Sequence, residues 1–261
     1  MSLIGVAVLA AGVRLETRGM AWVDRLLLGV AALGFAPVVY ELLLGQVTLL
    51  IGAAMYPVTR GTDRFRNGIP VGIALALAPK PVILMVLVWM LVWRRRALAA
   101  ALLVAVVVTC LSVVLVGPDQ YGRWLSGLTG LVRESAAGTA QLVQKGNYSL
   151  WPLDPARIVV AAAVAGATLW TILKDPSRGF VAALFASLLL APYTGLYSMS
   201  ILLLAVTPAL VFSPRGTRAL ALTANLVLAL LPWVTAWTIG GLVACLPLER
   251  RPSLPKRPGR P

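Results

Sequence analysis

The sequence predicts an all-α protein, a polytopic transmembrane helical bundle of about eight to ten membrane segments, some of them short or paired in hairpins. Hydrophobic residues make up 59% of the 261 residues and charged residues only 12%, whereas a soluble domain carries about 25% charged residues. The charges are bunched into clusters, with long uncharged runs between them. No run alternates polar and apolar residues, which argues against a membrane β-barrel.

The uncharged runs supply the expected membrane segments. A bilayer core of about 30 Å needs roughly 20 apolar residues per helix, with about 17 as a lower bound. Run 97–116 meets this alone, and run 179–212 is long enough for two short passes with a break at Pro192. The complete set of runs is 26–40, 42–58, 68–79, 81–93, 97–116, 158–173, 179–212 and 219–248. We expect a transmembrane domain over residues 1–245 and a basic, disordered tail over 246–261.

The basic residues predict how the loops are sorted across the membrane. The net charge of +14 could indicate nucleic-acid binding, but the arginines lie in short loops between apolar runs, where the positive-inside rule explains them better. We place on the cytoplasmic side the clusters Arg14/Arg18/Arg25, Arg60/Arg64/Arg66, Arg94–Arg96, Lys174/Arg178, Arg215/Arg218 and the tail. The chain is then a multi-pass protein, expected in the plasma membrane in contact with membrane lipids.

The stretch 68–93 contains one charge, Lys80, between Pro79 and Pro81. Because the basic clusters before and after this stretch both belong on the cytoplasmic side, we expect it to form a hairpin with Lys80 at its turn. Each arm of about 12 or 13 residues rises only about 20 Å, so the turn should lie in a recess below the outer surface. The alternative is a single tilted helix with Lys80 near the midplane, at a cost of about 2.5–3.5 kcal/mol for the lysine.

The external connection 117–157 begins with an expected helix from Asp119 to about Glu134. Apolar residues including Trp124 and Leu128 recur there at helical spacing, and Arg123 lies off that stripe. We expect either an amphipathic helix lying in the outer membrane interface or one packed on neighbouring protein. The turn-rich segment 144–155 follows it.

Several chemistries are excluded by composition. The chain has no histidine, which removes Ser-His-Asp and Cys-His catalysis and the commonest zinc sites. Cys110 and Cys245 both fall in apolar runs, as small buried hydrophobic residues do. We expect no metal and no cofactor.

Four polar clusters fall on the predicted external side. Polar residues within a membrane protein face the bundle interior or a wet cavity, so they are candidates for a functional site. Lys80 can equally form a structural pair with Glu41, and we keep both interpretations. The candidate residues are Glu41, Gln46, Lys80, Asn147, Ser149, Tyr193 and Tyr197.

Three stretches together resemble one family. The first is "LLLGQVTLLIGAAMYPVTRGTDRFRNGIPVGIALALAPKPVILMVLVWMLVWRRRA", the second "GNYSL", and the third "LLLAPYTGLYSMSILLLAVTPAL". Their order and spacing over residues 26–210 resemble glycosyltransferase family 87. The resemblance implies a GT-C membrane enzyme that transfers mannose or another hexose from a polyprenyl-phosphate-linked sugar donor to a lipid or glycan acceptor outside the cytoplasmic face.

The resemblance also implies roles for residues. Lys80 matches the family's lysine and would bind the donor phosphate, Gln46 would line the site, and Asn147 and Ser149 would bind a sugar or acceptor. Position 48 is threonine where the family tends to have asparagine. The family's catalytic aspartate lies in a first external loop, and no residue of this sequence matches it, so the catalytic residue stays unknown and we expect an N-terminally truncated copy.

Two other classes of function remain open. A small transporter or flippase component also builds its site from broken helices with a polar turn, although the two halves of this chain show no internal repeat. A non-catalytic membrane subunit is the other alternative, because the catalytic aspartate has no match.

Overall fold

The computed structural model of the chain describes residues 19–34, 48–77, 83–137, 154–191 and 196–202, together with isolated positions that include Val38, Lys80, Leu150 and Thr194. All regular structure in these residues is helical, and none of them lies in a β-strand. The predicted all-α class is confirmed for this part of the chain. Run 219–248 and the tail lie outside the described residues, so the domain boundary at 245 stays a prediction.

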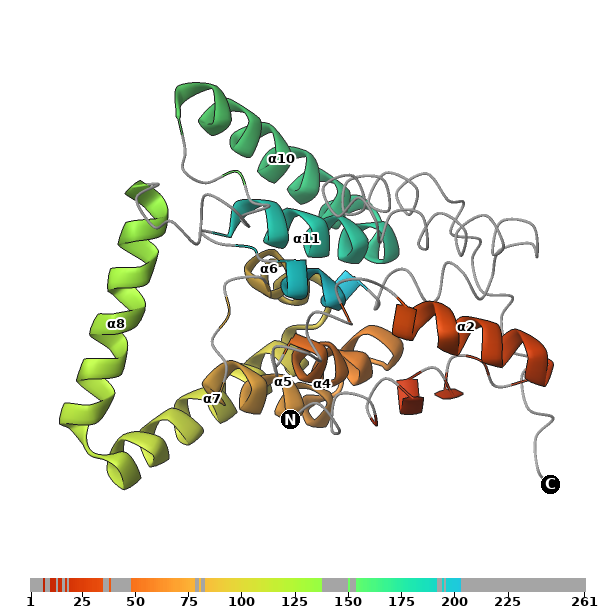
Figure 1. The fold of residues 1–261 in the computed structure, drawn as a ribbon, viewed down its shortest axis with the longest axis horizontal. Helices are drawn as coiled ribbons and strands as arrows, with labels where there is room; N and C mark the ends of the chain where they lie inside the picture. The colour runs from red at the N-terminus through yellow and green to blue at the C-terminus, as the bar shows by residue number, and fades with distance from the viewer. Residues whose placement is uncertain are drawn as a thin grey trace.

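Figure 1 shows the described helices along the chain. They are α2 (Trp22–Gly34), α4 (Thr48–Arg60), α5 (Phe65–Leu77), α6 (Leu84–Trp93), α7 (Arg95–Val116), α8 (Pro118–Ala137), α10 (Pro155–Lys174), α11 (Pro176–Leu190) and the 3-10 helix η2 (Leu196–Leu202). The break predicted at Pro192 is confirmed, because α11 ends at Leu190 and a separate 3-10 helix follows.

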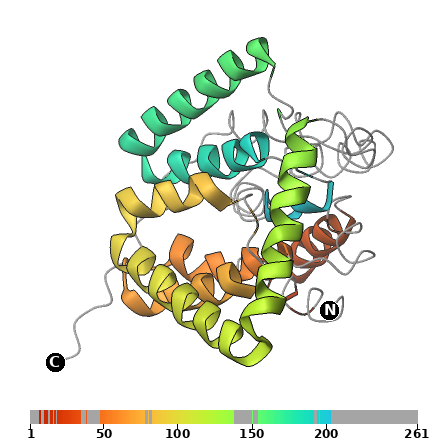
Figure 2. The same ribbon diagram turned by 90° about the vertical axis from the view of Figure 1, so that its left-hand side faces the viewer.

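Most of these helices form two groups that share an apolar core (Figures 1 and 2). One group is α6, α10 and α11, and the other is α4, α5 and α7. α6 also packs on α7, and η2 packs on both α4 and α11, so the groups are joined in two places. Met55, Met90 and Leu184 come from different helices of this core and are fully buried.

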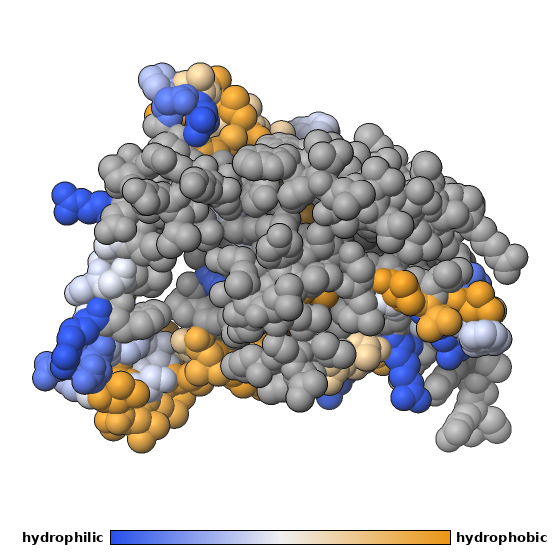
Figure 3. Space-filling view, viewed as in Figure 1, coloured by the Kyte–Doolittle hydropathy of each residue, from blue (hydrophilic) through white to orange (hydrophobic). Residues whose placement is uncertain are grey.

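α7 and α10 are long and apolar enough to cross a membrane. Only 11% of the most apolar window of each helix is buried inside the protein. Val114 and Leu115 on α7 and Val159 on α10 are exposed, and Figure 3 shows apolar side chains over the outer surfaces of both helices. Such continuous apolar surface is stable against lipid and costly in water. Each of the predicted runs 97–116 and 158–173 is therefore one helix with a lipid-compatible face.

The stretch around Lys80 is broken, and the alternative of one continuous tilted helix is wrong. α5 ends at Leu77 and α6 begins at Leu84. The start of α6 is fixed from another helix, because Ser187 Oγ accepts a hydrogen bond of 2.9 Å from the Met85 N–H. The arms do not form a compact hairpin: among the described helices, α5 packs chiefly on α7 and α4, whereas α6 packs on α11 and α7. The Lys80 segment thus crosses from one helix group to the other.

The contact between α5 and α7 depends on two glycines, four residues apart. A Cβ atom on Gly68 would overlap the carbonyl oxygen of Ala97, and one on Gly72 would overlap that of Ala101. Small residues at this spacing let membrane helices approach closely enough for backbone contact. This close approach attaches α5 to α7 and explains why α5 does not pair with α6.

The connection between α4 and α5 is tied to the start of α7. Asp63 Oδ1 and Oδ2 accept hydrogen bonds from the N–H groups of Ala97 and Arg96, at 3.1 and 3.3 Å. A carboxylate in this place satisfies amide groups that a helix start leaves without partners. The Arg94 Nε donates to the carbonyl of Val58, in the last turn of α4, at 3.1 Å. The basic clusters around Arg60 and Arg94 are therefore neighbours.

Two tryptophans of α6 attach the turn between α10 and α11 to the same end. Trp93 Nε1 donates to the Ile172 carbonyl at 2.6 Å, and Trp89 Nε1 donates to the Pro176 carbonyl at 2.7 Å. Both acceptors flank the tight turn between α10 and α11, where Asp175 accepts hydrogen bonds from the first amides of α11. The loops that carry the Arg60, Arg94 and Lys174 clusters thus gather at one end, as expected for loops on one side of a membrane.

The helix predicted from Asp119 to about Glu134 is confirmed as α8. Gly117, with a φ of 94°, forms the corner between α7 and α8, and a positive φ is tolerated best by glycine. Figures 1 and 2 both show α8 running crosswise to α7. Arg123 is exposed, while the side chains of Trp124 and Leu128 lie outside what the structure describes. The interfacial orientation of α8 stays a prediction.

Candidate functional site

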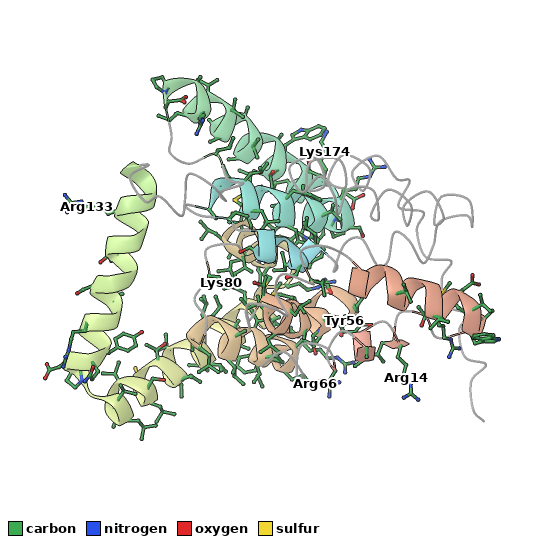
Figure 4. All side chains as sticks on the ribbon, viewed as in Figure 1. Arg14, Tyr56, Arg66, Lys80, Arg133 and Lys174 are labelled. Atoms are coloured by element: carbon green, nitrogen blue, oxygen red, sulfur yellow. The ribbon has the colours of Figure 1, made fainter. Side chains whose placement is uncertain are left out.

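Lys80 lies in the connection between α5 and α6, where the chain passes from one helix group to the other. Its Nζ donates a hydrogen bond of 2.9 Å to Thr48 Oγ1, a residue 32 positions earlier. The lysine is half-buried. Figure 4 shows Lys80 between Arg133, at the left, and Arg66 and Lys174, further right. Lys80 therefore lies between α8 and the basic loops along the long axis of this view.

Thr48 is the first residue of α4 and is fully buried. The helix that carries it is held in the core by Ile51, Met55 and Val58, which are all buried. A β-branched side chain on a fixed helix has few rotamers, so the position of its hydroxyl is well defined. The contact to Lys80 consequently joins a rigid helix start to the connection between α5 and α6.

The third segment in this region runs from the end of α11 into η2. Thr194 Oγ1 donates to the Leu188 carbonyl, and Thr194, Ser198 and Ser200 are all buried. η2 packs directly on α4. These hydroxyl groups therefore belong to the protein interior, close to the helix that carries Thr48.

A fourth segment reaches the same end of α11. The Leu150 N–H donates to the Leu189 carbonyl at 2.8 Å. Leu150 directly follows Asn147, Tyr148 and Ser149 in the sequence. The structure thus joins the segments around positions 48 and 80 in one contact and attaches the segments around positions 150 and 194 to the end of α11. The packing of η2 on α4 links the two regions.

The structure describes only part of the predicted set of site residues. Lys80 is described with its contacts, and Tyr197 is placed in η2 without a described side chain. The remaining candidates lie outside the described residues, namely Glu41, Gln46, Asn147, Ser149 and Tyr193. Their assignment to the site, and the pairing of Glu41 with Lys80, stay predictions.

The other described cations are exposed, apart from Arg60 and Arg94, which are half-buried at the basic end. Arg123 and Arg133 are exposed on α8, and Arg64, Arg66, Arg95 and Arg96 are exposed at the basic end. The described residues contain no group of three or more side chains that could hold a metal ion. In this region a half-buried lysine is the group suited to an anion, because its ammonium carries a full charge and three donors.

Ser198 and Ser200 are buried polar residues that the sequence did not single out. In the sequence they stand out only as two serines, two positions apart, in a largely apolar stretch after Pro192. On a regular α-helix that spacing places two residues on different faces, so it gave no reason to expect both side chains inside. Both are inside because η2 is buried on more than one face, as Ile201 and Leu202 of the same 3-10 helix are buried too.

Comparison with protein families gives one match. The model of glycosyltransferase family 87 matches residues 1–238, which include every segment of the candidate site. Comparison with curated proteins gave no match, and comparison with solved structures gave none either. The chain therefore belongs to glycosyltransferase family 87, a family of membrane glycosyltransferases.

Proposed function

We propose that this protein transfers a hexosyl group, mannosyl by its resemblance to the family, from a polyprenyl-phosphate-linked donor to a lipid or glycan acceptor. The transfer takes place on the external side of the plasma membrane, in which the chain is a multi-pass protein. The observation that carries the proposal is the placement of Lys80 in a helix break, half-buried and held by a buried hydroxyl.

The chemistry explains why a cation belongs at this place. An acceptor hydroxyl attacks the anomeric carbon, the bond from that carbon to the phosphate oxygen breaks, and polyprenyl phosphate leaves with the electron pair. The departing phosphate gains negative charge during this step. A fixed ammonium nearby stabilises that charge more in the transition state than in the ground state. The hydroxyl proton passes to a general base, a role that the family resemblance gives to an aspartate, and the residue of this chain that acts as the base stays unknown.

The remaining candidates are assigned to the sugar and the acceptor. The contact between Leu150 and Leu189 supports this, since it attaches the loop after Ser149 to the end of α11 that leads to Tyr193. Gln46 precedes the buried Thr48 by two residues. We assign the lining of the site to Glu41, Gln46, Asn147, Ser149, Tyr193 and Tyr197.

Removal of the ammonium tests the proposal. Lys80→Met should lower binding of radiolabelled polyprenyl phosphate to the purified protein, and kcat/KM for the polyprenyl-phosphate sugar, by about tenfold or more, because charge-assisted hydrogen bonds contribute about 1.5–3 kcal/mol each. Arg133→Met is the matched control. It removes an exposed cation of α8 and should leave both quantities unchanged.

A structural role for Lys80 makes a different prediction. If the lysine only neutralises Glu41, Lys80→Met should lower the unfolding temperature, and Glu41→Gln in the same protein should restore it together with phosphate binding. Such a restoration would refute the donor-phosphate assignment. Restored stability with binding still lost would support it.

A further inference from the structure

The contact between Thr48 and Lys80 assigns a role to a residue that the family comparison does not explain. The sequence alone assigns no role to Thr48. In the structure its Oγ1 lies 2.9 Å from the Lys80 Nζ and its side chain has no exposed surface. The hydroxyl therefore acts as an internal acceptor for the ammonium.

The two partners differ in rigidity. Thr48 begins a helix whose side chains Leu49, Ile51 and Met55 are buried in the core, and η2 packs on that helix. Lys80 has four rotatable bonds and lies outside the helices, between α5 and α6. A long side chain of this kind samples many rotamers unless a contact selects one. Thr48 is the fixed member of the pair, and Lys80 is the member that is oriented.

The chemical nature of the acceptor also matters. A carboxylate in the place of Thr48 would neutralise the ammonium and compete with a phosphate. A hydroxyl directs one of the three ammonium donors and leaves the charge intact. The positive charge that attracts an anion is therefore kept in this contact.

We propose that Thr48 is a positioning residue, which holds the Lys80 ammonium in the orientation that receives the donor phosphate. The proposal rests on the function proposed above for Lys80. Thr48 itself does not touch the reacting atoms. Its effect is exerted through the lysine, and a variant without the hydroxyl should lose phosphate affinity only while the lysine is present.

The test uses variants of the whole chain and polyprenyl phosphate as the probe. Thr48→Val keeps the shape of the side chain and removes the acceptor, and we expect it to weaken binding about fivefold, the effect of one hydrogen bond. Thr48→Ser keeps the hydroxyl and should bind as the wild type does. If Thr48→Val does not fold, Thr48→Cys serves instead, because a thiol is a weak acceptor of similar size.

A double-mutant cycle separates positioning from a purely structural role. In the Lys80→Met protein, the further change Thr48→Val should have no effect on binding, so the two changes are not additive. A fivefold loss that persists without the lysine, or a Thr48→Ser protein as weak as Thr48→Val, would overturn the proposal. Normal binding by Thr48→Val together with weak binding by Lys80→Met would overturn it as well, and would leave the role of Lys80 intact. Normal binding by Lys80→Met would refute the proposed function itself.

Discussion

Single polar residues in this chain form hydrogen bonds to helix ends. Another accepts a hydrogen bond from Lys80, a cation that is unfavourable in lipid. A lysine at the centre of a membrane helix costs about 2.5–3.5 kcal/mol. Lys80 lies instead in a helix break, with a hydroxyl acceptor from α4. Ser187 and Asp63 supply acceptors to the first turns of α6 and α7. Each of these contacts joins two segments that are distant in sequence, so each also fixes how the helices are placed.

Asp63 offers a test of this role at the residue scale. Asp63→Ala should destabilise the protein by about 1 kcal/mol, because the amides of Arg96 and Ala97 lose their acceptors. Thermal unfolding in detergent measures the effect. Asp63→Asn keeps an acceptor oxygen and should retain most of the stability. The control Arg123→Ala removes an exposed charge from the body of α8, and a loss as large as that of Asp63→Ala would contradict the capping role.

The sequence predicted which residues of the site are unusual but not what they contact. Lys80 stands out because it is the one charge in the stretch 68–93. Its contact with Thr48 depends on the placement of α4 against the α5–α6 connection, and no local pattern encodes that placement. Threonine inside an apolar run is also common, because its methyl group packs well and its hydroxyl can bond to its own helix. A buried hydroxyl with a distant partner therefore looks the same in sequence as an ordinary one.

At the scale of elements, the close approach of α5 and α7 decides how the broken stretch is folded. The sequence predicted the break at Lys80 correctly, since prolines and a charge interrupt the apolar run. It did not predict that α5 and α6 separate. The hairpin was expected only because the basic loops before and after this stretch belong on the same side of the membrane. The glycines that attach α5 to α7 are Gly68 and Gly72, and their partners are Ala97 and Ala101. Recognising this pairing requires matching small residues across two helices.

The α5–α7 contact can be tested with a pair of glycine variants. Gly68→Ala should destabilise the protein by about 1–3 kcal/mol, because the added Cβ overlaps the Ala97 carbonyl oxygen and forces the helices apart. Gly166→Ala, in α10, places the same methyl group in open space. It should leave stability unchanged or raise it by up to about 1 kcal/mol, since alanine favours helix. Equal unfolding temperatures for the two variants would show that α5 and α7 do not touch.

At the scale of the whole molecule, the described helices order the charges along one axis. The loops with the Arg60, Arg94 and Lys174 clusters gather at one end, while α8 lies at the other (Figures 1 and 4). The lipid-compatible faces of α7 and α10 run between these ends. Lys80 lies on the α8 side of Arg66 along the long axis of Figure 4. This arrangement fits a membrane whose cytoplasmic surface is at the basic end and whose outer surface is near α8.

Cysteine labelling in intact cells tests that orientation. In a protein without the native thiols (Cys110→Ser, Cys245→Ser), an impermeant thiol reagent added outside should label Arg133→Cys rapidly, because position 133 is exposed on α8. It should label Lys80→Cys more slowly, because position 80 is half-buried. Arg64→Cys, at the basic end, should react only after the cells are opened. If Lys80→Cys reacts only from the cytoplasmic side, with Arg64→Cys, the orientation is wrong. The lysine would then lie on the opposite side of the membrane from the proposed donor, and external sugar transfer at this site would fail with it.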